Sequence, residues 1–491
     1  MASDPRELEA YRLMRAGRLE EARELAILAV ADKKVCSTTH GLLATILVQL
    51  GRRSDADSVV LQAIEYEPGV ADAYDALAYV SRHLGHHERA NDLYRRATER
   101  EPRTARFWYN LASSERSLGK LQEAEAACDR AIALDGTHYP SYLLRSELRV
   151  QTPQANHVEA LGRLLAQPWP EDRARLFLGY ALGKELDDLG RFDEAFRRFS
   201  DAAAIRRRHL AYDVALDERK IQRIIEVYPH GSGETRRSPG DSARYIFIVG
   251  LPRSGTTLVE RILTGLPGVQ SNGETDNFAR ALLGGASAPQ GAGAPGSDVF
   301  SVAAEADSEE VARRYARLSS GDSKSLRVIE KLPMNYLYLG AIHRALPEAT
   351  LILVRRSVLD SCFAMYRTLF GQGYPFSYDF EDLARYCASY ELLVKHWRAT
   401  LCDELHEIIY EDLVREPRKV GAMLASACGL PWSDDAIEVQ KNTGVSLTAS
   451  ASQVRRPIYG TSSGRWRHYR VHLEPLILAL RRRGFELSED A

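Results

Sequence analysis

The sequence predicts two folds in one chain: an array of α-helical repeats, followed by an α/β domain built on a doubly wound parallel sheet. Three observations support this prediction. Small residues recur at a constant interval through the N-terminal half of the chain. Apolar segments of strand length, near residues 326–331, 350–356 and 406–413, alternate with helical patterns in the C-terminal half. A glycine-bounded loop joins the first of these strands to the helix that follows it.

Composition limits the class of protein. The 491 residues and their 45% apolar content suffice for two or three domains. A net charge of −2 predicts no general surface for polyanions, so a basic site would have to be local. The six cysteines are widely spaced, which predicts free thiols rather than disulfides or a zinc site. The N-terminus lacks the apolar core of a signal peptide, and no apolar run is long enough for a membrane helix. We therefore expect a soluble, cytoplasmic protein without metal, nucleic-acid or membrane contacts.

The N-terminal half repeats with a period of 34 residues. The glycines of this period are Gly17, Gly51, Gly85 and Gly119. An alanine follows each glycine by five residues, and alanines at two other positions keep the same interval. This is the tetratricopeptide pattern, in which small residues let paired helices approach closely and glycine closes the turn between them. One more pair, Gly190 and Ala195, predicts a last repeat after a degenerate one. We expect a helical solenoid over residues 3–228.

Sequence alone leaves the ligand of this solenoid open. Repeat arrays often bind peptides, so docking of a protein substrate or partner is one interpretation. A scaffold or an oligomerisation surface, as in a homodimer, is the other. Residues 229–242 (PHGSGETRRSPGDS) form a polar stretch rich in glycine and proline, which predicts a linker. The second domain then covers residues 243–488.

The stretch that starts at Tyr245 predicts a strand, a tight loop and a helix. The loop, residues 250–257 (GLPRSGTT), is an anion cradle, since glycine lets the backbone approach a phosphate group and the first helical turn presents unpaired N–H groups. A P-loop nucleotide triphosphatase would have lysine where Thr256 stands. A later apolar strand ends in Arg355 and Arg356 rather than in a magnesium-binding aspartate. These differences disfavour a kinase or NTPase and predict a metal-free site with two phosphate positions.

Two segments together resemble the sulfotransferases that use 3′-phosphoadenosine-5′-phosphosulfate (PAPS): PRSGTT at 252–257 and the RR-x3-D segment at 355–360. Two further matches resemble the tyrosylprotein sulfotransferase branch. Gly273-Glu274-Thr275 lies at that branch's spacing after the loop, and the QVRRP stretch at 453–457 is followed by Arg465-Trp466 as it is there. The chain is thus identified as a member of a tetratricopeptide-repeat sulfotransferase family. The resemblance covers roughly its C-terminal half.

The resemblance implies three catalytic residues. Glu274 matches the general base, Lys331 matches the lysine at the leaving oxygen and the 5′-phosphosulfate, and Arg253 matches the loop arginine near the transferring group. Simpler interpretations stay open for each: a loop carboxylate, a solvated lysine at a strand end, and an ion pair between Arg253 and Glu260. Many other sulfotransferases use histidine as the base, and His343 is the alternative here.

The resemblance also implies a site for the cofactor PAPS. Its 5′-phosphate would be cradled by the loop residues Ser254, Gly255, Thr256 and Thr257. Arg356 matches the arginine of the 3′-phosphate, which in the family lies eight residues before a serine. That serine position holds Ala364 here, and Ser361, one turn nearer on the same helix face, could replace it.

The C-terminal segment is expected to complete this site. Ala451 stands where the family has a serine two residues before the glutamine, and Ser450 or Ser452 is expected to replace it. Arg456 and Arg465 are expected to close over the cofactor, because arginine suits bidentate contact with phosphate. A basic surface loop is the alternative interpretation of this segment.

These inferences predict a PAPS-dependent sulfotransferase whose acceptor is a hydroxyl group, by resemblance a tyrosine of a peptide or protein. A phenol has a pKa of about 10, so a carboxylate base is useful at neutral pH. The aromatic segment 370–379 (FGQGYPFSYD) is expected to line the acceptor site. Carbohydrate, lipid and small phenolic acceptors stay open. So does an adaptor that binds nucleotide without turnover, which Ala364 and Ala451 motivate.

Overall fold

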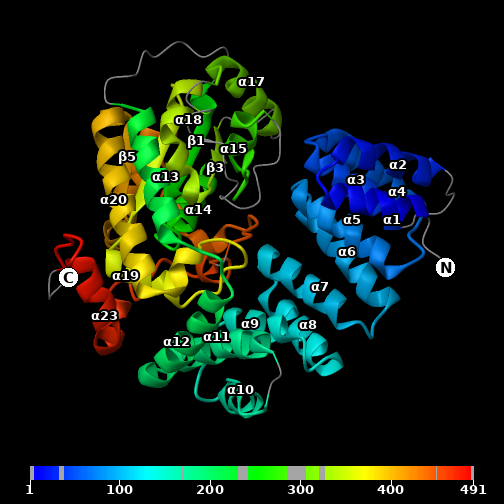
Figure 1. The fold of residues 1–491 in the computed structure, drawn as a ribbon, viewed down its shortest axis with the longest axis horizontal. Helices are drawn as coiled ribbons and strands as arrows, with labels where there is room; N and C mark the ends of the chain where they lie inside the picture. The colour runs from blue at the N-terminus through cyan, green and yellow to red at the C-terminus, as the bar shows by residue number, and fades with distance from the viewer. Residues whose placement is uncertain are drawn as a thin grey trace. The chain divides into compact units, whose positions relative to one another are not determined.

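The structure, a computed structural model, divides the chain into two compact units. It describes residues 5–31, 38–168, 171–229, 242–284, 303, 306–319, 327–448 and 450–487. The first unit, Met1–Leu148, is called the repeat unit below, and the second, Arg149–Ala491, the sheet unit. Each is described by itself (Figure 1).

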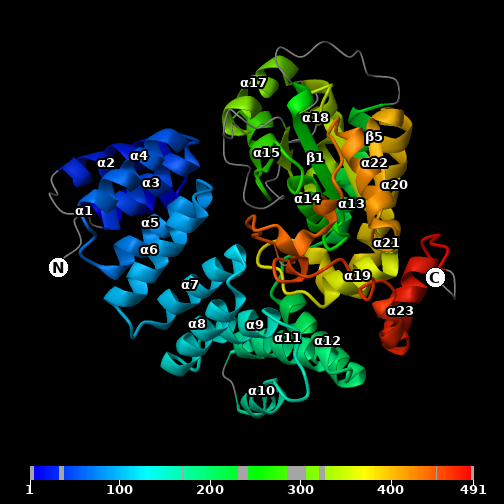
Figure 2. The same cartoon turned by 180° about the vertical axis from the view of Figure 1, so that it is seen from behind.

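The repeat unit is a stack of antiparallel helix pairs (Figures 1 and 2). Its helices are α1 (Pro5–Arg15), α2 (Leu19–Ala31), α3 (Thr38–Gln49), α4 (Arg53–Glu65), α5 (Ala71–His83), α6 (His87–Arg100), α7 (Ala105–Leu118), α8 (Leu121–Leu134) and α9 (Tyr139–Glu147). The periodic glycines lie in the turns within the pairs, with φ between 76° and 89°, a region that favours glycine. The periodic alanines are buried at the helix contacts. The predicted helical repeats are confirmed.

The sheet unit begins with four more helices. They are α10 (Val158–Leu165), α11 (Asp172–Asp188), α12 (Phe192–Arg208) and α13 (Val214–Val227). Helices α11 and α12 form the hairpin predicted at Gly190, yet they belong to the sheet unit. They bond to a later part of that unit, since the Tyr180 hydroxyl donates to the Tyr366 carbonyl at 3.1 Å. The division between the units therefore falls ahead of the predicted solenoid end at residue 228. The predicted linker, 229–242, lies outside the described residues except at its two ends.

A five-stranded parallel sheet organises the rest of this unit, in the order β2-β3-β1-β4-β5. The strands are β1 (Tyr245–Gly250), β2 (Val269–Ser271), β3 (Arg327–Glu330), β4 (Thr350–Arg355) and β5 (Leu405–Ile409). The sequence predicted all except β2, whose three residues are too few to show a pattern. The strand expected over 406–413 ends instead at Ile409, and helix α21 (Tyr410–Arg415) follows at once.

The two faces of the sheet differ because successive residues of a strand point to opposite sides. Ile246 and Ile248 face an aliphatic core with α14 (Thr256–Thr264) and α22 (Pro417–Ala427). Phe247 faces an aromatic core, 5.9 Å from the ring of Phe278 and 5.4 Å from that of Tyr315. The other helices are α15 (Asn277–Leu282), α17 (Ser308–Ser319), α18 (Leu339–Ala345), α19 (Val358–Tyr366), α20 (Phe380–Leu401) and α23 (Arg470–Arg481). The predicted fold class is confirmed.

Two general expectations bear on the described residues. In the described ranges, no helix is both long and apolar enough to span a bilayer. The five cysteines described there are free thiols, and Cys36 lies outside them.

Candidate active site

Four predicted site residues follow four different strands. Arg253 comes after β1, Glu274 after β2, Lys331 directly after β3 and Arg356 directly after β4. Because the strands are parallel, their carboxyl ends share one edge of the sheet, where ligands bind in such folds. Two contacts lie at this edge: Lys331 pairs with Glu274, and Arg356 Nη1 donates to the carbonyl of Arg253 at 3.0 Å.

The glycine loop between β1 and α14 is tightly enclosed. Gly255 has φ +106°, and a Cβ added there would lie 2.4 Å from Cδ2 of Tyr410, so only glycine fits. Arg253 also has a positive φ, +67°, which is uncommon for a residue with a side chain and typical of functional sites. Thr256 and Thr257 are buried in the first turn of α14, whose N–H groups face the loop.

The side chain of Arg253 bonds to the C-terminal segment rather than to the helix. Its Nη1 donates to Ser450 Oγ, and its Nη2 donates to Gln453 Oε1 at 2.9 Å. In contrast, Glu260 bonds to Ser271 and lies near Lys331. The alternative ion pair between Arg253 and Glu260 is therefore wrong. Gln453 was part of the quoted motif, yet nothing in the sequence marked it as a partner of the loop.

Lys331 is the most deeply buried charge of the site. Its side chain is 0% exposed, and Nζ lies 2.5 Å from Glu274 Oε1 and 3.7 Å from Glu260 Oε2. The interpretation of Lys331 as a solvated strand-end residue is therefore wrong. Glu274 keeps 33% of its side chain exposed, so an acceptor group can reach it. A buried ammonium needs such partners, because leaving it unpaired is strongly unfavourable.

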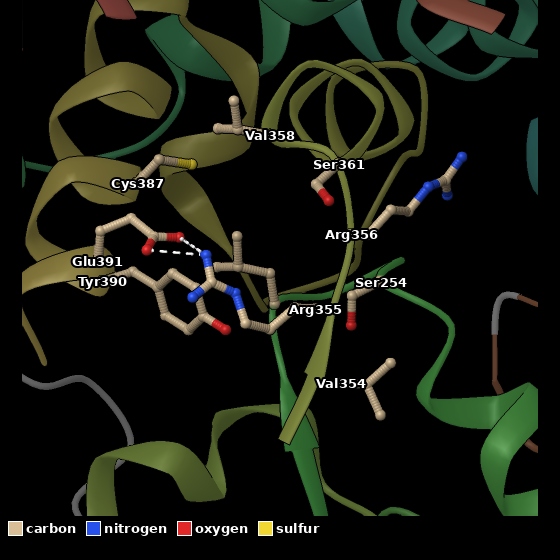
Figure 3. A pocket seen from close by; sticks show the side chains of 10 residues that line it. Ser254, Val354, Arg355, Arg356, Val358, Ser361, Cys387, Tyr390 and Glu391 are labelled. Carbon is tan, nitrogen blue, oxygen red and sulfur yellow. Dashed lines mark hydrogen bonds and ion pairs between the residues drawn. The ribbon is translucent and has the colours of Figure 1, made fainter. Parts of the chain in front are cut away.

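Arg356 forms the second basic position, beside the loop. Its guanidinium carbon lies 4.8 Å from the centroid of the Tyr410 ring, and its Nη2 donates to the Ser462 carbonyl. Arg355 points to the other side of the strand end, where Nη2 donates to both carboxylate oxygens of Glu391 at 2.9 Å (Figure 3). The sequence analysis missed Tyr410, because it placed this residue inside a strand.

Arg356 and Ser361 line a common pocket (Figure 3). The other lining residues are Leu251, Ser254, Val354, Arg355, Val358, Cys387, Tyr390 and Glu391. The Oγ atoms of Ser254 and Ser361 and Nε of Arg356 are buried without a hydrogen-bond partner among the described residues. Buried donors are rarely left unpaired in proteins, so these three atoms fit an anionic ligand such as a phosphate group. Ala364, on the same helix, is buried and offers no side-chain donor.

Arg465 has a different partner from the one expected. Its Nη2 lies 2.8 Å from Asp187 Oδ2, which also lies 2.7 Å from Nη1 of Arg367. The other carboxylate oxygen, Asp187 Oδ1, accepts a hydrogen bond from the Tyr469 hydroxyl. Burial alone would raise the pKa of Asp187, but Arg367 and Arg465 outweigh it and lower that pKa. The carboxylate of Asp187, on helix α11, thus compensates the positive charge of Arg465.

Two other predicted residues, Ser452 and Arg456, belong to the same C-terminal segment. Ser452 is buried and Arg456 is half-buried, and the described residues include no ion-pair partner for Arg456. Their role in a cofactor site stays a prediction.

The aromatic segment 370–379 includes Tyr374. Burial raises the pKa of Tyr374, and the charge of Glu274 raises it further. The Tyr374 ring lies 4.7 Å from that of Phe370. Within the segment, the Tyr378 hydroxyl donates to the Phe370 carbonyl at 2.8 Å. From outside it, Arg206 Nη2 of α12 donates to the Gly371 carbonyl at 2.6 Å.

His343, the alternative base, lies elsewhere. It is on α18, which precedes β4, and its Nδ1 is 3.3 Å from Glu404, directly before β5. Both residues therefore belong to the amino edge of the sheet, opposite the glycine loop. Among the described side chains, no group of three His, Cys, Asp or Glu could hold a metal ion, and metal-free chemistry stays a prediction.

Comparison with known proteins identifies both parts of the chain. Residues 245–434 match the model of the sulfotransferase family, and residues 76–138 match a tetratricopeptide-repeat model. The chain therefore contains a sulfotransferase-family domain after tetratricopeptide repeats. An uncharacterized protein of Aquifex aeolicus (strain VF5) is 30% identical over 380 residues, which are 76% of this chain and 49% of that protein. The chain thus spans about half the length of this curated relative.

Solved sulfotransferase domains are more distant. The domain of the Synechococcus PCC 7002 olefin synthase is 20% identical, with a TM-score of 0.36 over 53% of this chain and 100% of that one. The domain from the curacin biosynthetic pathway is 18% identical, with the same score over 52% of this chain and 100% of that one. Likeness at this level carries no information about the acceptor.

Proposed function

We propose that the sheet unit is a PAPS-dependent sulfotransferase that transfers a sulfuryl group to a phenolic hydroxyl, that of a tyrosine in a peptide or protein. The observation that carries the proposal is the buried Lys331–Glu274 pair at the same sheet edge as a glycine loop. The loop has Thr256 in place of a nucleotide-triphosphatase lysine, and β4 ends in arginines instead of a magnesium-binding carboxylate. Sulfotransferases of this family generally use PAPS.

The residues present fit this cofactor. Ser254, Gly255, Thr256 and Thr257 would hold its 5′-phosphate through backbone and hydroxyl donors, and Arg356 with Ser361 would hold the 3′-phosphate. The unpaired Oγ atoms of Ser254 and Ser361 support both assignments. Bound there, PAPS would supply the sulfuryl group.

Each catalytic residue then has one task. The exposed oxygen of Glu274 accepts the proton of the acceptor hydroxyl, which makes that oxygen a better nucleophile. Lys331 and Arg253 supply fixed positive charge where negative charge develops on the leaving oxygen. Lys331 is buried, and two carboxylates lie within ion-pair distance of its Nζ.

The aromatic segment supports a phenolic acceptor. Phe370 and Tyr374 contribute rings near Glu274, and aromatic pairs favour offset or edge-to-face contact with another ring. Tetratricopeptide repeats generally mediate protein interactions, and we propose that those of the repeat unit bind the acceptor protein or a partner. Carbohydrates, lipids and small phenols are the competing acceptors for a direct assay.

The first test is calorimetric binding of 3′-phosphoadenosine-5′-phosphate (PAP), without magnesium, to the wild type, Arg356→Ala and Arg398→Ala. We expect metal-independent binding that Arg356→Ala weakens at least tenfold, because a charge-assisted contact with phosphate is lost. Arg398→Ala removes an arginine of α20 that pairs with Glu407 and should bind like the wild type. Binding that requires magnesium would contradict the proposal.

A second candidate function is an adaptor that binds PAP without turnover. Ala364 and Ala451 favour it, because both stand where the resembled family has serine. Transfer of radioactive sulfate from PAPS to a synthetic poly(Glu,Tyr) peptide separates the two functions. PAP binding without transfer to the peptide, to 4-nitrophenol or to a carbohydrate acceptor would favour the adaptor.

A further inference from the structure

Lys331 lies between two carboxylates, of which the proposed mechanism uses only one. Glu274 holds Nζ at 2.5 Å from the exposed side, and Glu260 lies 3.7 Å away on the buried side, with its side chain 12% exposed. Glu260 belongs to the second turn of α14, the helix that starts at the glycine loop. The same helix that presents the phosphate cradle therefore also presents a second counter-charge to the catalytic lysine.

Glu260 is held rigidly in this place. Ser271 Oγ, at the end of β2, donates to Glu260 Oε1 at 2.5 Å and accepts from the Gly273 N–H at 2.9 Å. The carbonyl of Gly273 in turn accepts from the N–H of Lys331 at 3.0 Å. The ends of β2, β3 and the middle of α14 are thus joined around one ammonium group, and Oε2 of Glu260 faces it.

The pairing of Lys331 with Glu274 conflicts with the role of Glu274 as a base. An ammonium group beside a carboxylate favours its ionised form and so makes it a weaker proton acceptor. Lys331 must therefore leave Glu274 when the acceptor hydroxyl arrives. A buried ammonium that lost its only counter-charge would be strongly destabilised.

We propose that Glu260 is a positioning residue that retains Lys331 when Glu274 releases it. The proton passes from the acceptor oxygen to a carboxylate oxygen of Glu274, while Lys331 and Glu260 keep their protonation states. Lys331 then faces the leaving oxygen with Glu260 behind it as its remaining counter-charge. This proposal rests on the proposed sulfotransferase function and adds a residue to it.

Arg261, the charged residue next to Glu260, is bonded elsewhere. Arg261, the next residue of α14, directs its guanidinium to Asn442, with Nη1 3.0 Å from Oδ1. Among the described carboxylates, only Glu260 and Glu274 lie within ion-pair distance of Lys331. Loss of the Glu260 charge would leave Lys331 bound to Glu274 alone.

The test compares Glu260→Gln, Glu260→Asp and the surface control Glu226→Gln of α13. Glutamine keeps the acceptor for Ser271 and removes only the charge. We expect Glu260→Gln to lower kcat for transfer from PAPS to poly(Glu,Tyr) about 10- to 100-fold, the scale of a lost positioning contact. Calorimetric PAP binding should stay equal or become tighter, because a negative charge has left the phosphate site. Glu260→Asp should recover part of kcat, and Glu226→Gln should match the wild type.

Several results would overturn the proposal. Unchanged kcat in Glu260→Gln would show that the charge is not needed, and an Asp variant no better than Gln would show the same. PAP binding that weakens in step with kcat would indicate a structural role instead. A wild type that does not bind PAP at all would contradict the proposed function itself, so the two failures are distinguishable.

Discussion

The periodic helix contacts of the repeat unit and the sheet of the second unit bury different kinds of side chain. At the helix contacts of the repeat unit, Ala22, Ala56 and Ala90 are at most 1% exposed. In the sheet unit, large aromatic rings fill one face of the sheet, and Lys331, Glu330 and Asp187 are buried as well. Alanine at a helix contact serves close packing alone. A buried charge is unfavourable unless specific partners surround it, so it marks a place where the fold is organised around chemistry.

The largest effect expected from this difference is on turnover. Glu274→Gln removes the proposed base while leaving its shape, and transfer to poly(Glu,Tyr) should fall about 10²- to 10⁴-fold. PAP binding should stay near that of the wild type, because Glu274 is placed on the acceptor side. Glu309→Gln, on the surface of α17, is the matched control. Near-normal turnover in Glu274→Gln would remove Glu274 from the mechanism.

The next effect concerns Asp187, the buried carboxylate that ties α11 to the C-terminal segment. Asp187→Asn leaves Arg367 and Arg465 without their counter-charge and should destabilise the sheet unit by about 3 kcal/mol, near the lower end for breaking a buried ion pair. In calorimetry the transition of the sheet unit should shift to lower temperature while that of the repeat unit stays. An equal shift of both transitions would contradict the division into two units. Tighter PAP binding in this variant would indicate that Asp187 withholds Arg465 from the cofactor.

How much the sequence could predict differs between the units. The period of 34 residues predicted the helix pairs and the left-handed turns at Gly51 and Gly85, because every contact that sets them is local. In the sheet unit the sequence predicted strands directly ahead of the loop of Arg253 and at Lys331, and both residues follow strands. Motif residues are visible in sequence because the chemistry restricts residue type and spacing.

The remaining contacts could not be predicted, because they join distant segments. The pairing of Arg465 with Asp187 spans both ends of the sheet unit, and no local pattern encodes it. Tyr410 follows an apolar run that has the length of a strand, so its place at a helix start was hidden. For Glu260 the sequence offered an ion pair with Arg253 only as the alternative interpretation, whereas the sheet brings Lys331 to it instead.

A smaller, pH-dependent effect compares one buried glutamate in each unit. Burial raises the pKa of Glu330 to about 7, and burial also raises that of Glu115 to about 7, although Arg95 at 3.7 Å opposes it there. A carboxyl with a raised pKa holds its proton in the folded state, so its contribution to stability declines as pH rises from about 4.5 to about 7. Glu330→Gln should abolish that decline, which in the wild type lowers the free energy of unfolding of the sheet unit by up to about 3 kcal/mol at pH 8.

The measurement is urea unfolding from pH 4 to pH 8. Glu115→Gln should abolish a decline of similar size in the stability of the repeat unit, because burial raises the pKa of both glutamates to about 7. A free energy of unfolding that rises with pH in the wild type and is unaffected by Glu330→Gln would contradict the assignment.

The smallest expected effect on stability tests the boundary between the repeat unit and the sheet unit, with one equivalent turn in each. Gly85 joins α5 to α6 in the repeat unit, and Gly190 joins α11 to α12 in the sheet unit. Their φ values are +89° and +73°, and a Cβ on either would meet nothing within 4 Å, so alanine adds only the strain of a left-handed backbone. Each alanine variant should lose about 1 kcal/mol.

The two variants should differ in which unit's thermal unfolding transition shifts. Gly85→Ala should lower the melting temperature of the repeat unit, whereas Gly190→Ala should lower that of the sheet unit, because α11 and α12 bond to α19 and α20 through Tyr366 and Asp382. Differential scanning calorimetry of both variants separates the outcomes. If both lowered the same transition, α11 and α12 would unfold with the tetratricopeptide repeats that they resemble in sequence. If only the expected transition moves in each, this helical hairpin folds with the sheet unit, where Arg206 of α12 holds the Gly371 carbonyl.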